Sequence, residues 1–218
     1  MCDALIWSFD AIAGLPWLEV IKALAPVVTA LIAWRALQNW SRQDKAKRQA
    51  DFLDQLLEAV HDFMGKMPAP VTVVDLIKIG MASHIPMQGK NSDPLVAGAI
   101  EYVERQGDTD AKRLIETLEA VRPVVTRLRA LRAKGNVFKF QNYAGCANAV
   151  GLLVWQFDRM QGLASFMRNP HWYWENEEVI AQLKKLMAIE PEDIRTQLNT
   201  HHGAIISCVG ETYGQVYR

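Results

Sequence analysis

The feature that most constrains the fold is an apolar stretch close to the N-terminus. Residues 11–34 contain only two charged side chains, Glu19 and Lys22, and residues 23–34 contain none. A membrane-spanning helix needs about 20 apolar residues, whereas a run of about twelve suits a buried core helix as well. The strongly apolar side chains between residues 20 and 32 contribute about −3 kcal/mol to insertion, so the stretch is adequate but marginal as a span.

The residues on either side of this stretch favour a membrane. Trp17 and Trp34 bracket the apolar run, as aromatic residues do at membrane interfaces. Residues 1–19 carry acidic side chains and no Lys or Arg, whereas the segment that follows residue 34 is basic. Its basic side chains are Arg35, Arg42, Lys45, Lys47 and Arg48. By the positive-inside rule this asymmetry predicts an N-terminus outside and the bulk of the chain in the cytoplasm.

The sequence therefore predicts a single-pass anchor in the inner (cytoplasmic) membrane. The expected parts are a short extracytoplasmic segment (1–16), a transmembrane anchor (17–40) and a cytoplasmic helical domain (41–218). A secretory signal peptide is not expected, because the start lacks a positively charged region and a clear cleavage site. Two alternatives stay open, a helix lying in the membrane interface and a soluble protein whose first helix is buried.

One face of the predicted anchor carries small and polar residues. Lys22, Ala25, Thr29 and Ala33 are spaced three and four apart, which places them on one side of a helix. In lipid, small residues at this spacing let two helices approach closely, and a polar group can bond across the contact. We therefore consider self-association of the anchor through this face, against the alternative that alanine is simply common in helices.

Charge and cysteine content narrow the classes of partner. The chain has 24 basic and 24 acidic side chains, so a nucleic acid is not an expected partner. Its three cysteines, Cys2, Cys146 and Cys208, are odd in number and widely spaced. This pattern argues against a disulfide framework and indicates a reducing compartment.

After the apolar stretch the chain carries apolar residues at helical spacing, divided by Pro, Gly and Asn. The predicted helices cover residues 17–64, 71–81, 94–106, 109–134, 143–167, 177–187 and 191 onward. We expect Asp93 to cap one of them, Pro26 to kink the first, and Gly107 and Gly135 to end two others. Residues 137–140 alternate like a strand but are too short for a sheet, so an extended linker is expected. The predicted fold is all-α, a transmembrane helix that continues into a bundle of about six to seven helices.

Two clusters outside the anchor are candidate binding residues. The aromatic side chains Trp172, Tyr173 and Trp174 would bind a partner if exposed, or cover the end of the core if buried. A basic set consists of Arg122, Arg127, Arg129 and Arg132. It is either a solvated face near a helix C-terminus or a contact for anionic lipid or phosphate.

No catalytic motif is present. The chain has no Gly-rich phosphate loop, nucleophile elbow or paired metal-ligand motif, and adjacent histidines such as His201 and His202 point about 100° apart on a helix. We therefore expect no cofactor and no metal, and take Cys146 as an inert core thiol.

The predicted function is a non-catalytic, membrane-anchored interaction protein that binds another protein or its own copies, together with membrane lipid. In architecture it resembles the small anchored helical effectors of bacterial anti-phage and toxin systems. Two alternatives remain. One is a membrane-tethered ligand-binding or enzymatic bundle, for which His171, His201 and His202 are the residues to test. The other is a soluble subunit of a larger complex with residues 11–34 buried at an interface.

Overall fold

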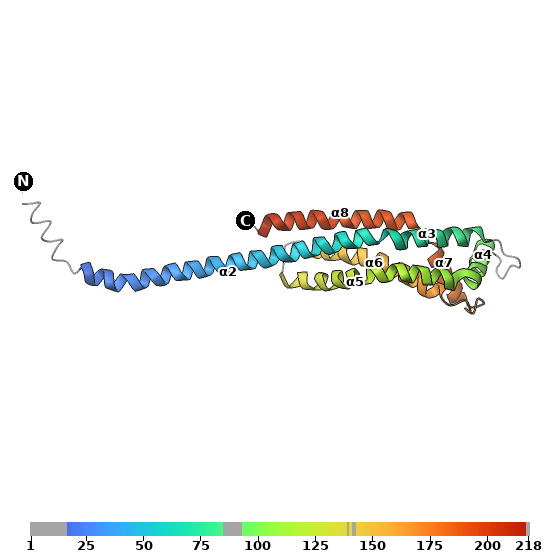
Figure 1. Ribbon diagram of the computed structural model, residues 1–218, viewed down its shortest axis with the longest axis horizontal. Coiled ribbons are helices and arrows are strands. Elements are labelled where there is room, and N and C mark those ends of the chain that lie inside the picture. Colours follow the sequence, from blue (N-terminus) through green and yellow to red (C-terminus); the bar gives the residue numbers. More distant parts are fainter. Residues whose placement is uncertain (1–16, 85–92, 139, 141–142, 217–218) are drawn as a thin grey trace, which may run out of the picture. The chain divides into compact units, whose positions relative to one another are not determined.

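The computed structural model describes residues 17–84, 93–138, 140 and 143–216, with only the helical backbone for residues 17–23. Every regular element in these residues is a helix, so the all-helical prediction is confirmed (Figure 1). The elements are α2 (Trp17–Lys66), α3 (Pro68–Ser83), α4 (Pro94–Tyr102), the π-helical turn η1 (Val103–Gly107), α5 (Asp108–Phe138), α6 (Tyr143–Met167), α7 (Glu177–Met187) and α8 (Pro191–Val216). The predicted extracytoplasmic segment, residues 1–16, lies outside the described residues.

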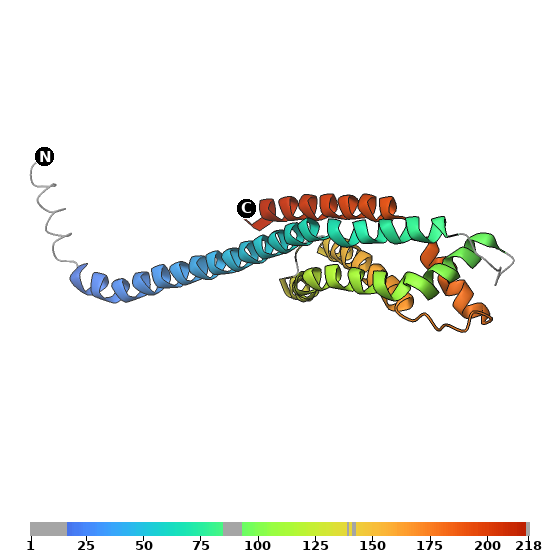
Figure 2. The ribbon, with the colours of Figure 1, turned by 45° about the vertical axis from the view of Figure 1, so that its right-hand side comes forward.

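The chain forms two compact units, residues 1–48 and residues 49–218. The described part of the first unit is a single helical segment, the N-terminal part of α2. The second unit is a helical bundle in which α5 packs along α6 and α6 packs along α8. α8 also lies beside α3, as two views of the bundle show (Figures 1 and 2). The core of this bundle is aliphatic and aromatic. Its largest fully buried side chains include Phe52, Phe63, Phe157, Leu114, Leu128 and Leu153.

Several helix starts follow directly from local sequence. The Asp93 side chain accepts a hydrogen bond from the backbone N–H of Leu95 at 3.0 Å, and Pro94 occupies the first helical position of α4. Asn176 caps α7 in the same way, accepting from the N–H of Glu178 at 2.8 Å. These contacts satisfy backbone donors that the first turn of a helix leaves free. The predicted cap at Asp93 is confirmed.

Two glycines predicted to end helices lie inside continuous helical backbone. Gly107 closes the π-helical turn that leads into α5, and Gly135 lies three residues before the end of α5. A Cβ atom on Gly107 would lie 2.7 Å from the backbone oxygen of Met167, and one on Gly135 would lie 1.9 Å from the ring of Tyr143. Both glycines therefore serve close packing between elements rather than helix termination.

The predicted linker at residues 137–140 is wrong for its first half. Val137 and Phe138 belong to α5. The rings of Phe138 and Phe140 both pack on Phe52, with centroid distances of 5.2 and 5.8 Å. The alternation seen in the sequence places two aromatic side chains in one hydrophobic cluster and does not mark a strand.

None of the described helices combines the length and the apolarity needed to cross a membrane. The transmembrane anchor predicted at residues 17–40 is therefore not supported. The uncharged apolar run, residues 23–34, covers about 18 Å of helix, whereas the hydrocarbon core of a bilayer is about 30 Å thick. Arg35, Gln38 and Asn39 follow it at once along the same helix.

Candidate interaction surface

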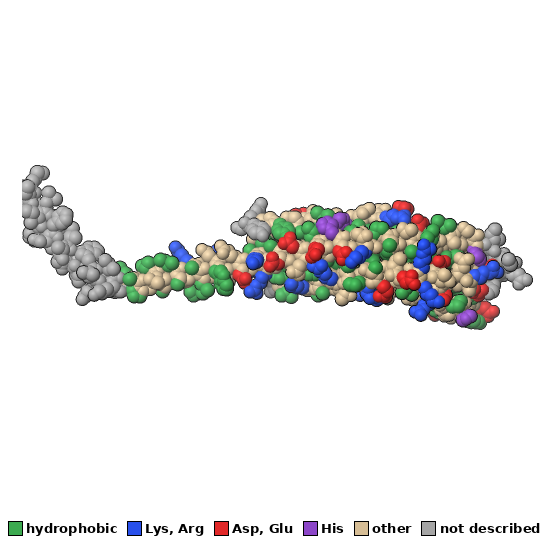
Figure 3. Space-filling view, viewed as in Figure 1, with side chains coloured by type: hydrophobic (Ala, Val, Ile, Leu, Met, Phe, Trp, Pro, Cys, Tyr) green, Lys and Arg blue, Asp and Glu red, His purple; other side chains and the backbone are tan. Residues whose placement is uncertain are grey.

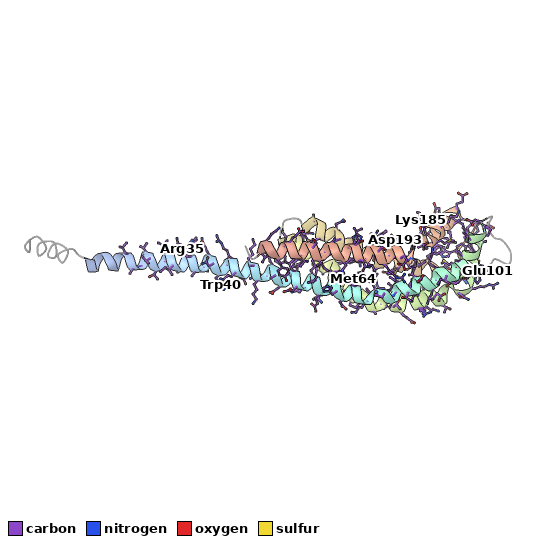
Figure 4. The ribbon with its side chains drawn as sticks, turned by 90° about the horizontal axis from the view of Figure 1, so that it is seen from above. Arg35, Trp40, Met64, Glu101, Lys185 and Asp193 are labelled. Carbon is purple, nitrogen blue, oxygen red and sulfur yellow. The ribbon has the colours of Figure 1, made fainter. Side chains whose placement is uncertain are left out.

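The N-terminal part of α2 carries large apolar side chains that are exposed. Every residue from 24 to 43 is exposed. Eight large apolar side chains there retain 51–66% of their accessible surface: Leu24, Val27, Val28, Leu31, Ile32, Trp34, Leu37 and Trp40. Figure 3 shows apolar atoms over this part of α2, and Figure 4 shows Arg35 and Trp40 projecting from it. We call residues 24–40 the exposed apolar segment.

Such a segment is costly to leave in water. Burying one Val or Leu side chain contributes about 1.5–3 kcal/mol, so eight of them supply a large driving force for association. A helix that is apolar around most of its circumference is normally buried against other elements or in lipid. The exposed apolar segment is therefore the strongest candidate for an interaction surface in the described residues.

One line along this segment has the spacing of a coiled-coil seam. Leu24, Val27, Leu31 and Trp34 follow one another at intervals of three, four and three residues. In sequence the same spacing continues back to Trp17 and Val20. We call Leu24, Val27, Leu31 and Trp34 the apolar seam. The prediction of a membrane anchor rests on overall apolarity and not on spacing, so it does not distinguish these four residues from the other apolar ones.

The predicted self-association face lies on the opposite side of α2 from the apolar seam. At 100° per residue, Ala25, Thr29 and Ala33 centre about 180° away from the seam residues. All three are exposed, and the Thr29 hydroxyl donates a hydrogen bond to the carbonyl oxygen of Ala25 at 2.8 Å. The Thr29 donor is thus satisfied within its own helix. For Lys22 the structure describes the helical backbone but not the side chain.

The basic residues after the apolar segment are solvent-exposed. Arg35, Arg42, Lys45, Lys47 and Arg48 all lie at the surface of α2. Arg48 pairs with Asp44 one turn earlier at 2.7 Å. Their suggested part in membrane orientation stays a prediction.

Three of the four arginines in the predicted anion-binding set are held by carboxylates. Arg122 pairs with Glu119, Arg127 with Glu58 and Arg129 with Asp158, each at 2.7 Å. Such exposed pairs contribute little stability, about 0–1 kcal/mol each, but they reduce the charge available to an external anion. Among the described residues, the Arg132 guanidinium contacts no carboxylate.

The aromatic cluster is divided between core and surface. The Trp172 ring stacks on Phe166 at 4.9 Å, and its indole N–H donates to the carbonyl oxygen of Phe166 at 2.9 Å. The indole N–H of Trp174 donates to Glu104 at 2.9 Å. Tyr173 alone is well exposed, at 66%. Trp172 and Trp174 therefore cover one end of the core, and partner binding by this cluster stays a prediction.

The histidines and cysteines form contacts that no sequence spacing indicated. The rings of His61 in α2 and His202 in α8 meet edge to face at 5.3 Å, and His202 Nε2 is buried without a hydrogen-bond partner in the described structure.

Burial raises the pKa of the Cys146 thiol to about 12, with a further contribution from the neighbouring Cys208 thiol. Cys146 is therefore protonated near neutral pH, which agrees with the prediction of an inert core thiol.

Acidification is expected to destabilise the bundle through His202. Burial, with a smaller contribution from His61, lowers the pKa of His202 below its ordinary value of 6.5. The unfolded chain then takes up this proton at a higher pH than the folded chain. The stabilisation is complete above the unfolded-state pKa and is lost as the pH falls through the lower folded-state pKa.

Urea titrations at about pH 7 and pH 5 test this expectation. The free energy of unfolding should fall less between the two conditions in a His202→Gln variant than in the wild type. The matched control is His201→Gln, which changes the adjacent, half-buried histidine and should keep the wild-type difference. Equal pH dependence in the His202→Gln variant and the wild type would contradict the assignment.

Neither a metal-binding cluster nor a similar protein indicates a function for the described residues. Within residues 24–84, 93–138 and 143–216, no three His, Cys, Asp or Glu side chains come together as a metal site would require. No protein-family model matches the chain, and neither a curated protein nor a solved structure is significantly similar to it.

Proposed function

We propose that this protein is a helical assembly protein that pairs with a second copy of itself through the apolar seam of α2. The observation that carries the proposal is the exposure of eight large apolar side chains on one continuous helical segment. The bundle, residues 49–218, has its own buried core, to which none of these side chains belongs.

The spacing of the seam favours a second copy over an unrelated partner. Residues at alternating intervals of three and four form a stripe that packs against an identical stripe on another helix. Such pairing is self-complementary and closes with two-fold symmetry, so it does not lead to open-ended aggregation. In water the hydrophobic effect drives apolar side chains together, whereas pairing through small residues is the mode favoured in lipid.

Charges at the two ends of the seam favour an antiparallel pair. Glu19 precedes the seam in sequence, and Arg35 and Arg42 follow it. Lys22 also precedes the seam, but its spacing places it with Ala25, Thr29 and Ala33 on the opposite face. An antiparallel pair centred between Leu24 and Trp34 would bring position 19 of one copy beside position 39 of the other. Position 39 lies between the two arginines along the helix. A parallel pair would instead bring like charges together at both ends.

Sedimentation equilibrium of the full chain without detergent tests the proposal. The wild type is expected to be a dimer at micromolar concentration. A Leu31→Asp variant places a carboxylate in the seam and should weaken the dimer by about 3 kcal/mol, or roughly 100-fold in Kd. The matched control Ala33→Asp makes the same change in charge on the opposite face and should remain dimeric. Both variants should keep the thermal stability of the bundle, because neither residue belongs to its core.

The outcomes separate the two faces of α2. If Ala33→Asp dissociates the dimer while Leu31→Asp does not, the small-residue face is the contact and the seam is not. A wild-type chain that stays monomeric without detergent, but sediments with lipid vesicles, would overturn the proposal in favour of the membrane. A monomer in both conditions would leave the exposed apolar segment to a different protein and also overturn it.

A further inference from the structure

A pocket of about 610 Å³ opens between the C-terminal part of α5 and the first turns of α6. Its lining residues are Arg129, Arg132, Ala133, Asn136, Ala144, Ala147 and Asn148. The pocket is open to solvent, and its three small alanine side chains leave room for a ligand beside the polar groups. None of these lining residues is acidic.

Arg132 supplies the uncompensated charge of this pocket. Its guanidinium contacts no carboxylate in the described structure, while the neighbouring Arg129 pairs with Asp158 at 2.7 Å. The guanidinium lies against the backbone of α6 at Gly151. A Cβ atom on Gly151 would sit 3.0 Å from both Cζ and one terminal nitrogen of Arg132. The absence of a side chain at residue 151 thus allows the guanidinium to rest there.

The amide side chains beside Arg132 can donate N–H groups to a ligand. Asn136 lies one helical turn after Arg132 on α5, and Asn148 reaches the pocket from α6. Ala144 and Ala147 place the pocket beside the first two turns of α6, where the helix dipole is positive. The Arg132 guanidinium and the two amide NH2 groups, with no acid among the lining residues, suit the oxygens of a phosphate group better than they suit a cation. Arg129 lies beside them but is already paired with Asp158.

We propose that this pocket binds the phosphate group of a small molecule or of a lipid head group. A nucleic acid is disfavoured, because Arg122 and Arg127 outside the pocket are each held by a carboxylate. A phosphate backbone would instead need a row of available cations. The site belongs to the bundle and is independent of pairing through α2, so either conclusion stands without the other.

Calorimetric titration of the full chain with inorganic pyrophosphate at constant ionic strength tests the site. Binding is expected for the wild type, with at least a tenfold weaker Kd for Arg132→Gln. Gly151→Ala keeps the net charge but displaces the guanidinium, and should weaken binding several-fold. The matched control is Arg122→Gln, which removes an equal charge from the same helix outside the pocket and should bind as the wild type does. Thermal unfolding of each variant checks that the bundle is intact.

A second arm separates the two sources of phosphate. Sedimentation with phosphatidylcholine vesicles is measured with and without phosphatidylglycerol, in a Leu31→Asp background that weakens the exposed apolar segment. Added binding to the phosphatidylglycerol vesicles that Arg132→Gln abolishes assigns the pocket to a lipid head group. Pyrophosphate binding without added binding to the phosphatidylglycerol vesicles assigns the pocket to a soluble ligand. The proposal is overturned if neither probe binds, or if Arg122→Gln weakens binding as much as Arg132→Gln.

Discussion

A Gly135→Ala variant is expected to unfold with a free energy about 3 kcal/mol lower than the wild type, the upper part of the range for overpacked cores. The added Cβ would lie 1.9 Å from Tyr143 Cζ and 2.0 Å from its hydroxyl oxygen. Tyr143 has little freedom to move aside. It is 6% exposed, and its hydroxyl group lies 3.1 Å from the carbonyl oxygen of Arg132, to which it donates. Relief of the clash therefore requires a shift of α5 against α6.

Thermal and urea unfolding measure this effect. A chain of this size loses about 2–4 °C in Tm per kcal/mol, so a decrease of roughly 10 °C is expected. The control is Gly162→Ala, because a Cβ atom on Gly162 in α6 would meet nothing within 4 Å apart from its own turn of helix. Alanine there should leave the stability unchanged or raise it by up to about 1 kcal/mol. A Gly135→Ala variant as stable as the wild type would show that Tyr143 does not fill this space.

A Phe52→Ala variant is expected to lose about 4 kcal/mol of unfolding free energy, as is typical of large-to-small changes at buried phenylalanines. Phe52 is fully buried. Its ring contacts the rings of Phe138, Phe140 and Tyr143 at centroid distances of 5.2, 5.8 and 6.1 Å. Truncation would leave a cavity among three aromatic rings that join the C-terminal part of α2 to the end of α5 and the start of α6.

The same helix offers the matched control. Trp40 is larger than Phe52 but retains 66% of its accessible surface, so Trp40→Ala should change the unfolding free energy by less than about 0.5 kcal/mol. Both substitutions are best made in a Leu31→Asp background, so that dimer formation does not contribute to the measured stability. Equal losses for Phe52→Ala and Trp40→Ala would mean that the exposed apolar segment is part of the folding unit.

Local sequence predicted the bounds of helices well where these depend on periodicity and on capping residues near the helix ends. α6 and α7 have the predicted bounds, and Asp93-Pro94 starts α4 as expected. Helical periodicity and capping depend on neighbours within about four residues, so they can be judged without the rest of the chain. The exposed apolar segment is equally visible in sequence, because its composition does not depend on what packs against it.

The glycines and the charged residues could not be judged in this way. Gly135 looks like a helix end in sequence, and only its position under Tyr143 shows why α5 continues through it. The arginines of α5 look alike in sequence, yet Glu58 and Asp158 from other helices neutralise two of them and leave Arg132 available. Partners so distant along the chain are chosen by the packing of the bundle.

By itself, then, the sequence determined that the chain is helical, where most helices begin, and that its first helix carries an apolar segment. Only the tertiary structure decided that the core of the bundle contains none of the segment's side chains, that Trp172 and Trp174 cover the core, and that Arg132 lines a pocket beside Gly151. The physical reason is the separation along the chain over which each kind of interaction is made. Backbone hydrogen bonds and caps are satisfied within a few residues, whereas burial and charge compensation depend on side chains brought together from distant parts of the chain.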